Sequence, residues 1–253
     1  MGLLLLWALP RTPLAAHWLT IPEKTWIERE LARNAALIRV PVRHNVWRNI
    51  TNPTVLQFGA IGIVLNLFGT CLVLFAPAVL SARAGLDTHA IGHLVTGGGM
   101  LGVLGVLFVG WNSDRHGDRL HDAFICTLIC MSGLILIAGA PTPTLVMVGY
   151  LMFAATWFSS GVLTVSSWAD VLHPQQLAVG GAAINTLWQV GAFLSPYGFG
   201  LAKDATGGFT LGLIGSAVVA GVQALLILYV RARVASNRRA CQRIANEPEA
   251  LTL

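Results

Sequence analysis

Two side-chain amides, Asn185 and Gln189, lie one helical turn apart in a long apolar segment of the chain. Polar side chains inside a segment that crosses a membrane are costly, so their presence points to binding or to contact between helices. An amide donates and accepts hydrogen bonds, and it therefore binds carboxylate and hydroxyl oxygens without a fixed charge. We expect Asn185 to contact a substrate; the alternative is a hydrogen bond to a neighbouring helix.

Hydroxyl groups recur at helical spacing in another apolar segment. They are Thr156, Ser160 and Thr164, and the same face continues to Ser167 and Trp168. Ser and Thr in membrane helices often bond back to their own carbonyls, so each residue alone says little. Together they predict a polar cavity wall with an aromatic platform. Asn66 stands alone in a third apolar segment, where it either lines the same cavity or bonds another helix.

The composition is that of a membrane protein. Hydrophobic residues make up 55% of the chain, charged residues 11%, and the mean hydropathy is +0.69, whereas soluble domains carry about 25% charged residues. A spanning helix needs roughly 20 residues. We therefore predict an all-α, polytopic membrane protein with six spans, at 55–82, 91–109, 123–140, 145–168, 178–202 and 209–230.

The basic residues are distributed unevenly among the predicted connections. Fourteen of the sixteen Lys and Arg residues lie in the two ends of the chain and in segment 110–121, and only Arg83 and Lys203 lie on the other side. Cytoplasmic segments carry the excess of Lys and Arg. This predicts that both ends are cytoplasmic, and it explains the basic clusters without nucleic acid. Segment 110–121 is too polar for hydrocarbon, so we predict a turn there.

Reactive clusters are weak in this sequence. Cys126 and Cys130 are four residues apart and could form a metal or redox pair, but packing thiols explain them better. His89 and His93 provide too few ligands for a metal site. No nucleotide-binding loop, nucleophile elbow or zinc signature is found. We expect no enzyme, no catalytic residue, no metal and no cofactor.

Segment 110–121 reads GWNSDRHGDRLH and resembles the loop motif of the major facilitator superfamily, a class of secondary transporters. The matching residues are Gly110, Asp114, Arg115, Gly117 and Arg119. Asp118 departs from the pattern, because the family usually has a basic residue there. This form of the motif is similar to that of the anion:cation symporter family. Independently, His17-Trp18-Leu19-Thr20 followed by Glu23 and Trp26 resembles the loop that joins the two halves of those symporters.

The resemblance implies a fold of twelve helices in two six-helix halves, with this chain as the C-terminal half. The expected parts are the end of a truncated transmembrane helix at 1–10, a cytoplasmic central loop at 11–53, a six-helix bundle at 54–231 and a cytoplasmic tail at 232–253. A surface helix is expected within the loop, at 21–36. The expected partners are the lipid bilayer and a missing N-terminal half.

The implied function is proton-coupled symport of a small organic anion, such as a sugar acid, a dicarboxylate or an aromatic carboxylate, in the inner (plasma) membrane. Such transporters bind substrate at the midplane between the halves. The expected substrate-binding residues are Asn66, Thr164, Ser167, Trp168, Asn185 and Gln189, and Asn185 aligns with an Asn of the family. The five motif residues are expected to lock helix ends during the cycle. The alternatives are a truncated membrane protein that does not transport, and a membrane-embedded enzyme or sensor.

Overall fold

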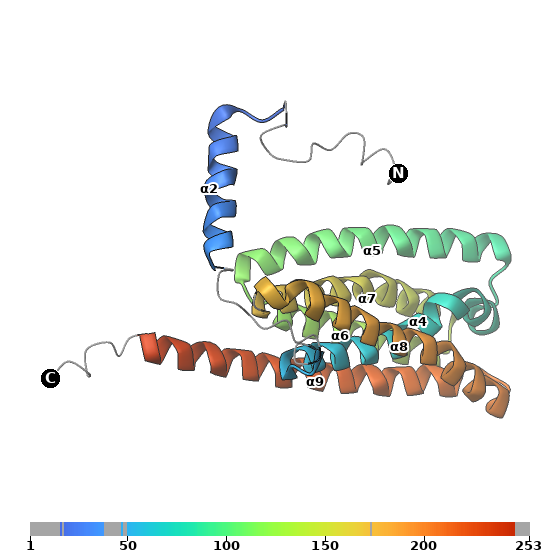
Figure 1. Ribbon diagram of the computed structural model, residues 1–253. Coiled ribbons are helices and arrows are strands. Elements are labelled where there is room, and N and C mark those ends of the chain that lie inside the picture. The colour runs from blue at the N-terminus through green and yellow to red at the C-terminus, as the bar shows by residue number, and fades with distance from the viewer. Residues whose placement is uncertain (1–15, 17, 38–46, 48–49, 173, 246–253) are drawn as a thin grey trace. The chain divides into compact units, whose positions relative to one another are not determined.

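The computed structural model describes residues 16, 18–37, 47, 50–172 and 174–245 (Figure 1). Within these residues the chain forms helices and short connections, and no strand occurs. Six of the described helices are long and apolar enough to cross a membrane. The chain divides into two compact units, Met1–Asn45 and Val46–Leu253. The all-α, polytopic fold predicted from the sequence is confirmed.

The first unit contains helix α2, Ile21–Leu37. The backbone N–H and the hydroxyl of Thr20 both donate to the carboxylate of Glu23, at 2.8 and 2.7 Å. These bonds lower the pKa of Glu23 below its usual value. The Thr-x-x-Glu spacing is that of a capping box, which marks a helix start. A helix at the predicted position, 21–36, is confirmed, whereas the predicted helix end at 1–10 lies outside the described residues.

The second unit is a bundle of the six spanning helices. They are α4 (Pro53–Ala84), α5 (Thr88–His116), α6 (Arg119–Gly139), α7 (Pro143–Val171), α8 (Pro174–Thr206) and α9 (Thr210–Ala245). Each predicted span overlaps one helix, and each helix is longer than its predicted span. The helices run on past the apolar stretches because capping side chains, such as Asn52 and Asp87, hold their ends.

The connection between α5 and α6 is shorter than the sequence predicts. Helix α5 continues through Gly110 to His116, and only Gly117 and Asp118 lie between the two helices. Gly117 has φ +69° and its N–H bonds the carbonyl of Ser113 at 2.8 Å. The predicted turn at 110–121 is therefore wrong in extent. Charged side chains at a helix end can reach the membrane surface while their backbone keeps its helical hydrogen bonds. The polarity of the segment therefore did not show where α5 ends.

The helices pack in pairs around two clusters of buried apolar side chains. Helix α4 lies along α8, α6 lies between α7 and α9, and α5 lies along α7 (Figure 1). Helix α5 is the most peripheral of the six. In its most apolar stretch of 18 residues 11% is buried, against 50% in the corresponding stretch of α6. Most of its surface is therefore left for lipid or for another protein.

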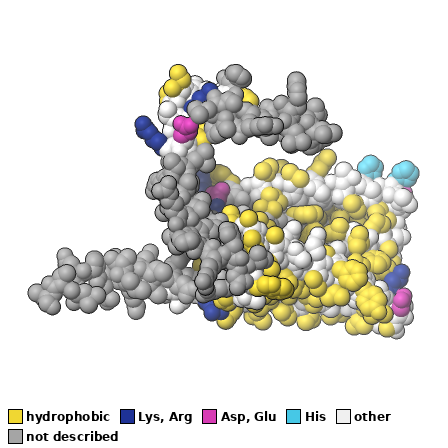
Figure 2. Space-filling model, viewed as in Figure 1, with side chains coloured by type: hydrophobic (Ala, Val, Ile, Leu, Met, Phe, Trp, Pro, Cys, Tyr) yellow, Lys and Arg dark blue, Asp and Glu magenta, His cyan; other side chains and the backbone are white. Residues whose placement is uncertain are grey.

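Charged side chains gather at the two ends of the bundle, and hydrophobic ones cover the long face between them (Figure 2). At one end, the Asn52 amide donates to Gln176 at 3.3 Å. At the other end, Arg83 donates to the carbonyls of Ile137 and Ala138, and the ammonium of Lys203 lies 4.9 Å from the Phe209 ring centroid. The two basic residues predicted to lie outside thus share one end of the bundle.

Candidate substrate-binding site

A concavity of about 350 Å³ opens where the middles of α4, α7 and α8 meet. Its lining includes Leu65, Asn66, Trp157, Phe158, Gly161 and Trp188. Asn66, Trp157 and Trp188 each lie near the centre of a helix of 29 to 33 residues. These three residues therefore lie about half-way along the helices that are long enough to span a membrane.

Two glycines of α4 shape this concavity. Gly62 lies one turn before Asn66 and Gly69 lies one turn after it. A Cβ atom at Gly62 would overlap the indole of Trp188, and one at Gly69 would overlap the indole of Trp157. The indole N–H of Trp188 donates to the carbonyl of Phe58 at 3.1 Å, and that of Trp157 donates to the carbonyl of Leu65 at 3.3 Å. Both indoles are therefore seated against α4 and held there.

Asn66 lies on α4 between Gly62 and Gly69, the two glycines that contact the indoles, and it is partly exposed. Its amide donates to the carbonyl of Gly62 at 3.1 Å, and its oxygen accepts from Thr70 at 3.4 Å. Both partners belong to α4, so among the described residues the predicted alternative of a bond to another helix is wrong. One N–H of the amide and one acceptor position remain free for a ligand. Binding of substrate by Asn66 stays a prediction.

The hydroxyl face of α7 points away from the concavity. Thr164 is fully buried and donates to the carbonyl of Ser160 at 2.8 Å. The hydroxyls of Ser160 and Thr127 of α6 lie 3.0 Å apart. The face predicted as a cavity wall thus packs on α6, because its hydroxyls are satisfied within the bundle. The opposite face of α7, with Trp157, Phe158 and Gly161, lines the concavity instead.

Ser167 and Trp168 lie nearer the end of α7. Ser167 is buried and donates to the carbonyl of Leu163 at 2.7 Å. It borders a second, more polar hollow of about 620 Å³, which Arg119 and Arg231 also line. The ring of Trp168 packs on α8, where a Cβ at Gly181 would lie 2.6 Å from its Cη2. The structure does not bring these two residues together with Asn66.

Asn185 and Gln189 are both exposed on α8, on one face as predicted. Neither side chain makes a hydrogen bond to another residue within the part of the chain that the structure describes. Asn185 precedes Trp188 by three residues, and side chains at this spacing are neighbours on a helix surface. An unpaired amide facing lipid in mid-membrane is costly, so this face is suited to a polar cavity or to a second protein surface.

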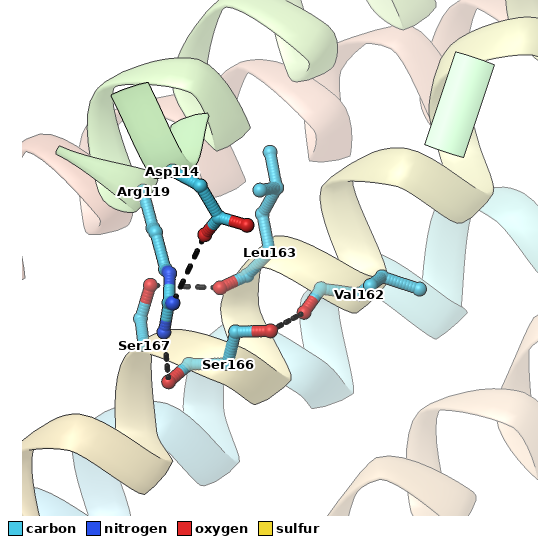
Figure 3. Close-up of polar contacts among 6 residues, drawn as sticks. All are labelled: Asp114, Arg119, Val162, Leu163, Ser166 and Ser167. Carbon is cyan, nitrogen blue, oxygen red and sulfur yellow. Dashed lines mark hydrogen bonds and ion pairs between the residues drawn. The ribbon is translucent and has the colours of Figure 1, made fainter. Parts of the chain in front are cut away.

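The motif residues connect three helices at one end of the bundle. The guanidinium of Arg119 lies 3.2 Å from the carboxylate of Asp114 and donates to the carbonyl of Ser166 at 3.4 Å (Figure 3). Arg119 thus joins the end of α5, the start of α6 and the end of α7. Arg115 stacks over the Trp111 ring at 3.8 Å. Gly110 has open space around it and contributes no contact. A gating role for this group stays a prediction.

Asp118, the residue that departs from the family pattern, caps α6 and pairs with α9. Its carboxylate accepts from the backbone N–H of His121 at 3.1 Å, and from Nε and Nη2 of Arg231 at 2.9 and 2.8 Å. Partial burial raises the pKa of Asp118, but these hydrogen bonds and the charge of Arg231 outweigh it and hold the pKa below its usual value. No local pattern predicts a partner 113 residues away.

Trp157, Phe158 and Trp188 were missed by sequence reasoning. One signal was present: Trp is enriched at the two membrane interfaces, so an indole near the centre of a span is unusual. For metals, no group of three or more His, Cys, Asp or Glu residues comes together among the described residues. Cys126 and Cys130 are buried free thiols, as expected of packing residues.

Six helices that are long and apolar enough to span a membrane define a polytopic membrane protein. The chain belongs to the Major Facilitator Superfamily, whose family model matches residues 1–196.

Three relatives illustrate this membership. A "Putative tartrate transporter" of Agrobacterium vitis is 28% identical over 90% of this chain and 50% of its own length. A "Quinolone resistance transporter" of Acinetobacter baumannii is 26% identical over 78% of this chain and 45% of its own. A "Putative metabolite transport protein NicT" of Pseudomonas putida is 26% identical, over 82% and 47%. The chain therefore spans about half the length of these relatives. No solved structure matches it.

Proposed function

We propose that this chain forms the C-terminal half of a secondary transporter that moves a small organic anion together with protons. The observation that carries the proposal is the concavity between α4, α7 and α8, where Asn66 lies between two indoles that contact α4. The relatives named for tartrate and metabolite transport support an organic anion as the cargo.

The second half of the pathway is expected to come from another six-helix unit. The chain matches only about half of each relative, and α5 and the amide face of α8 are exposed. We place the assembled protein in the plasma membrane, with the motif and both ends of this chain in the cytoplasm, because the basic residues gather on that side.

The proton-coupling residue is expected to lie outside this chain's mid-membrane region. The acidic residues of the six spanning helices, Asp114, Asp122, Asp170 and Asp204, lie in the first or last turns of those helices. The residues near the concavity are uncharged amides, hydroxyls and aromatic rings. They are suited to holding a substrate and not to exchanging a proton at neutral pH.

Uptake into proteoliposomes under an imposed proton gradient tests the proposal. The chain is reconstituted alone and joined to the part of the Agrobacterium vitis relative that it does not match. We expect proton-dependent anion uptake by the joined protein only, since one half cannot alternate the access of a shared site. Uptake by the chain alone, above empty liposomes, would contradict its role as a half. A joined protein that folds but takes up no anion would favour the alternative, a membrane protein that does not transport.

A further inference from the structure

We propose that the concavity between α4, α7 and α8 is a ring-binding subsite, which takes the planar aromatic ring of a carboxylate substrate. The proposal rests on the transport function above and narrows its substrate class. It is carried by the seating of Trp157 and Trp188 on Gly69 and Gly62, with Asn66 between them.

The two indoles present apolar surfaces to the concavity. Each indole N–H is already bonded to a carbonyl of α4, so neither needs a ligand partner. Trp157 is braced further by Phe153, whose ring is stacked at 5.9 Å, and by Phe158, whose ring meets it edge-on at 4.7 Å. Aromatic rings arranged in this way favour an additional ring packed flat or edge-on.

Gly161 leaves room for such a ring. Built on Gly161, a Cβ atom would have only the Cδ2 of Leu65 within 4 Å, at 3.4 Å. The concavity, at about 350 Å³, is within the range of small-molecule pockets. A polyhydroxy acid would fit this surface poorly, because its hydroxyls would lose water and find few partners among the lining side chains, which offer the amide of Asn66 and the hydroxyl of Ser166.

We expect the carboxylate of the ligand to lie outside the subsite, because the described side chains that line it are mostly apolar and an ionised group is costly to bury there. Outside the subsite, the exposed amide of Asn185 offers a hydrogen-bonding group, because Asn185 is a helix neighbour of Trp188. Asn66 remains available for a polar substituent on the ring. The arrangement therefore separates an apolar ring from a hydrated anionic group.

Three carboxylates that differ in shape test the subsite. Benzoate has a planar ring, cyclohexanecarboxylate has a puckered ring of the same size, and tartrate has no ring. Binding of each to the full chain in lipid nanodiscs is measured by calorimetry, and by the broadening of the fluorine NMR signal of 4-fluorobenzoate. We expect benzoate to bind about tenfold more tightly than cyclohexanecarboxylate and tartrate, a difference of about 1.4 kcal/mol.

A second test fills the concavity with a side chain and leaves both tryptophans unchanged. Gly161→Leu is expected to weaken benzoate binding about tenfold or more, since its side chain takes the place of the ring. Gly99→Leu on α5 is the matched control, because Gly99 has open space around it. Unchanged circular dichroism and gel filtration show that both variants fold. Tartrate or cyclohexanecarboxylate binding as tightly as benzoate would overturn the proposal, as would normal benzoate binding by Gly161→Leu.

Uptake by the joined protein separates this inference from the transport proposal. Uptake of tartrate without uptake or competition by benzoate would overturn the ring subsite and leave transport intact. No uptake of any anion, with benzoate binding that still depends on Gly161, would overturn transport and support the subsite.

Discussion

At the scale of single residues, the amide of Asn185 is the most direct candidate for contact with the anion. We predict that Asn185→Ala in the joined protein weakens substrate binding roughly tenfold to a hundredfold, because a hydrogen bond to a charged group contributes about 1.5–3 kcal/mol. Equilibrium binding measures the loss. Thr186→Ala is the control, since Thr186 is also exposed on α8 but bonds its own helix, at the carbonyl of Ala182. Normal binding by Asn185→Ala would show that Asn185 does not bind the substrate and serves only in contact between helices.

Gly62 is predicted to be intolerant of a side chain. A methyl group there overlaps the Trp188 indole, which is fixed by its bond to Phe58. We expect Gly62→Ala to destabilise the bundle by about 1–3 kcal/mol, as overpacking does. Thermal unfolding followed by fluorescence measures the change against Gly97→Ala, where a methyl group meets open space. Equal unfolding temperatures for the two variants would show that the indole shifts freely.

At the scale of the helices, Asp114 is predicted to act on the transport cycle and not on affinity. It lies at the end of α5, where its bond to Arg119 links α5 to α6 in this conformation. A bond that exists in one state only shifts the equilibrium between states. We expect Asp114→Asn in the joined protein to slow uptake while binding stays nearly unchanged. Asp204→Asn, an exposed acid at the end of α8, is the control. Unchanged uptake would refute the gating role.

The pair of Asp118 and Arg231 is predicted to be insensitive to pH in the physiological range. The pKa of Asp118 is lowered from 3.8, so the pair stabilises the fold above that value and loses its effect only at still lower pH. Asp118→Asn keeps a good helix cap but removes the charge. We expect a loss of less than about 1 kcal/mol, because both groups are partly exposed.

Thermal unfolding between about pH 5 and 8 tests this, since only histidine normally titrates there. The loss for Asp118→Asn is expected to be the same across the range. Arg231→Gln is expected to show a similar loss, and the double variant little more than either alone. A loss that varies with pH would contradict the prediction, whether it arises from Asp118 itself or from the nearby charge of His121.

The helices themselves were predictable from the sequence, but the directions of their faces were not. Apolar runs located all six spans, because hydrocarbon requires long apolar helices. Helical spacing showed that Thr156, Ser160 and Thr164 share a face, yet it could not show that this face packs on α6. The contacts of Trp157 and Trp188 with glycines of α4 form only where α4 meets α7 and α8. No local sequence pattern therefore predicts them. Asp118 finds its partner for the same reason, through packing between distant segments.

At the scale of the whole molecule, the orientation in the membrane is still a prediction. We expect Lys203→Cys to react with an impermeant maleimide in intact cells, and Asp114→Cys to react only after permeabilisation. The reason is the concentration of basic residues at the end that carries the motif. Both are made in a background without the four native cysteines. Labelling of position 203 only after permeabilisation would reverse the orientation.

The two-residue turn between α5 and α6 has a mechanical consequence. A connection of only Gly117 and Asp118 is too short to absorb a movement. A displacement of the end of α5 along its axis therefore also displaces the start of α6. Next to this connection, Arg119 donates to a carbonyl of α7, and Asp118 pairs with Arg231 of α9. Helix α5 has little buried surface of its own. We therefore expect a partner bound to the exposed face of α5 to act on the bundle partly through this turn.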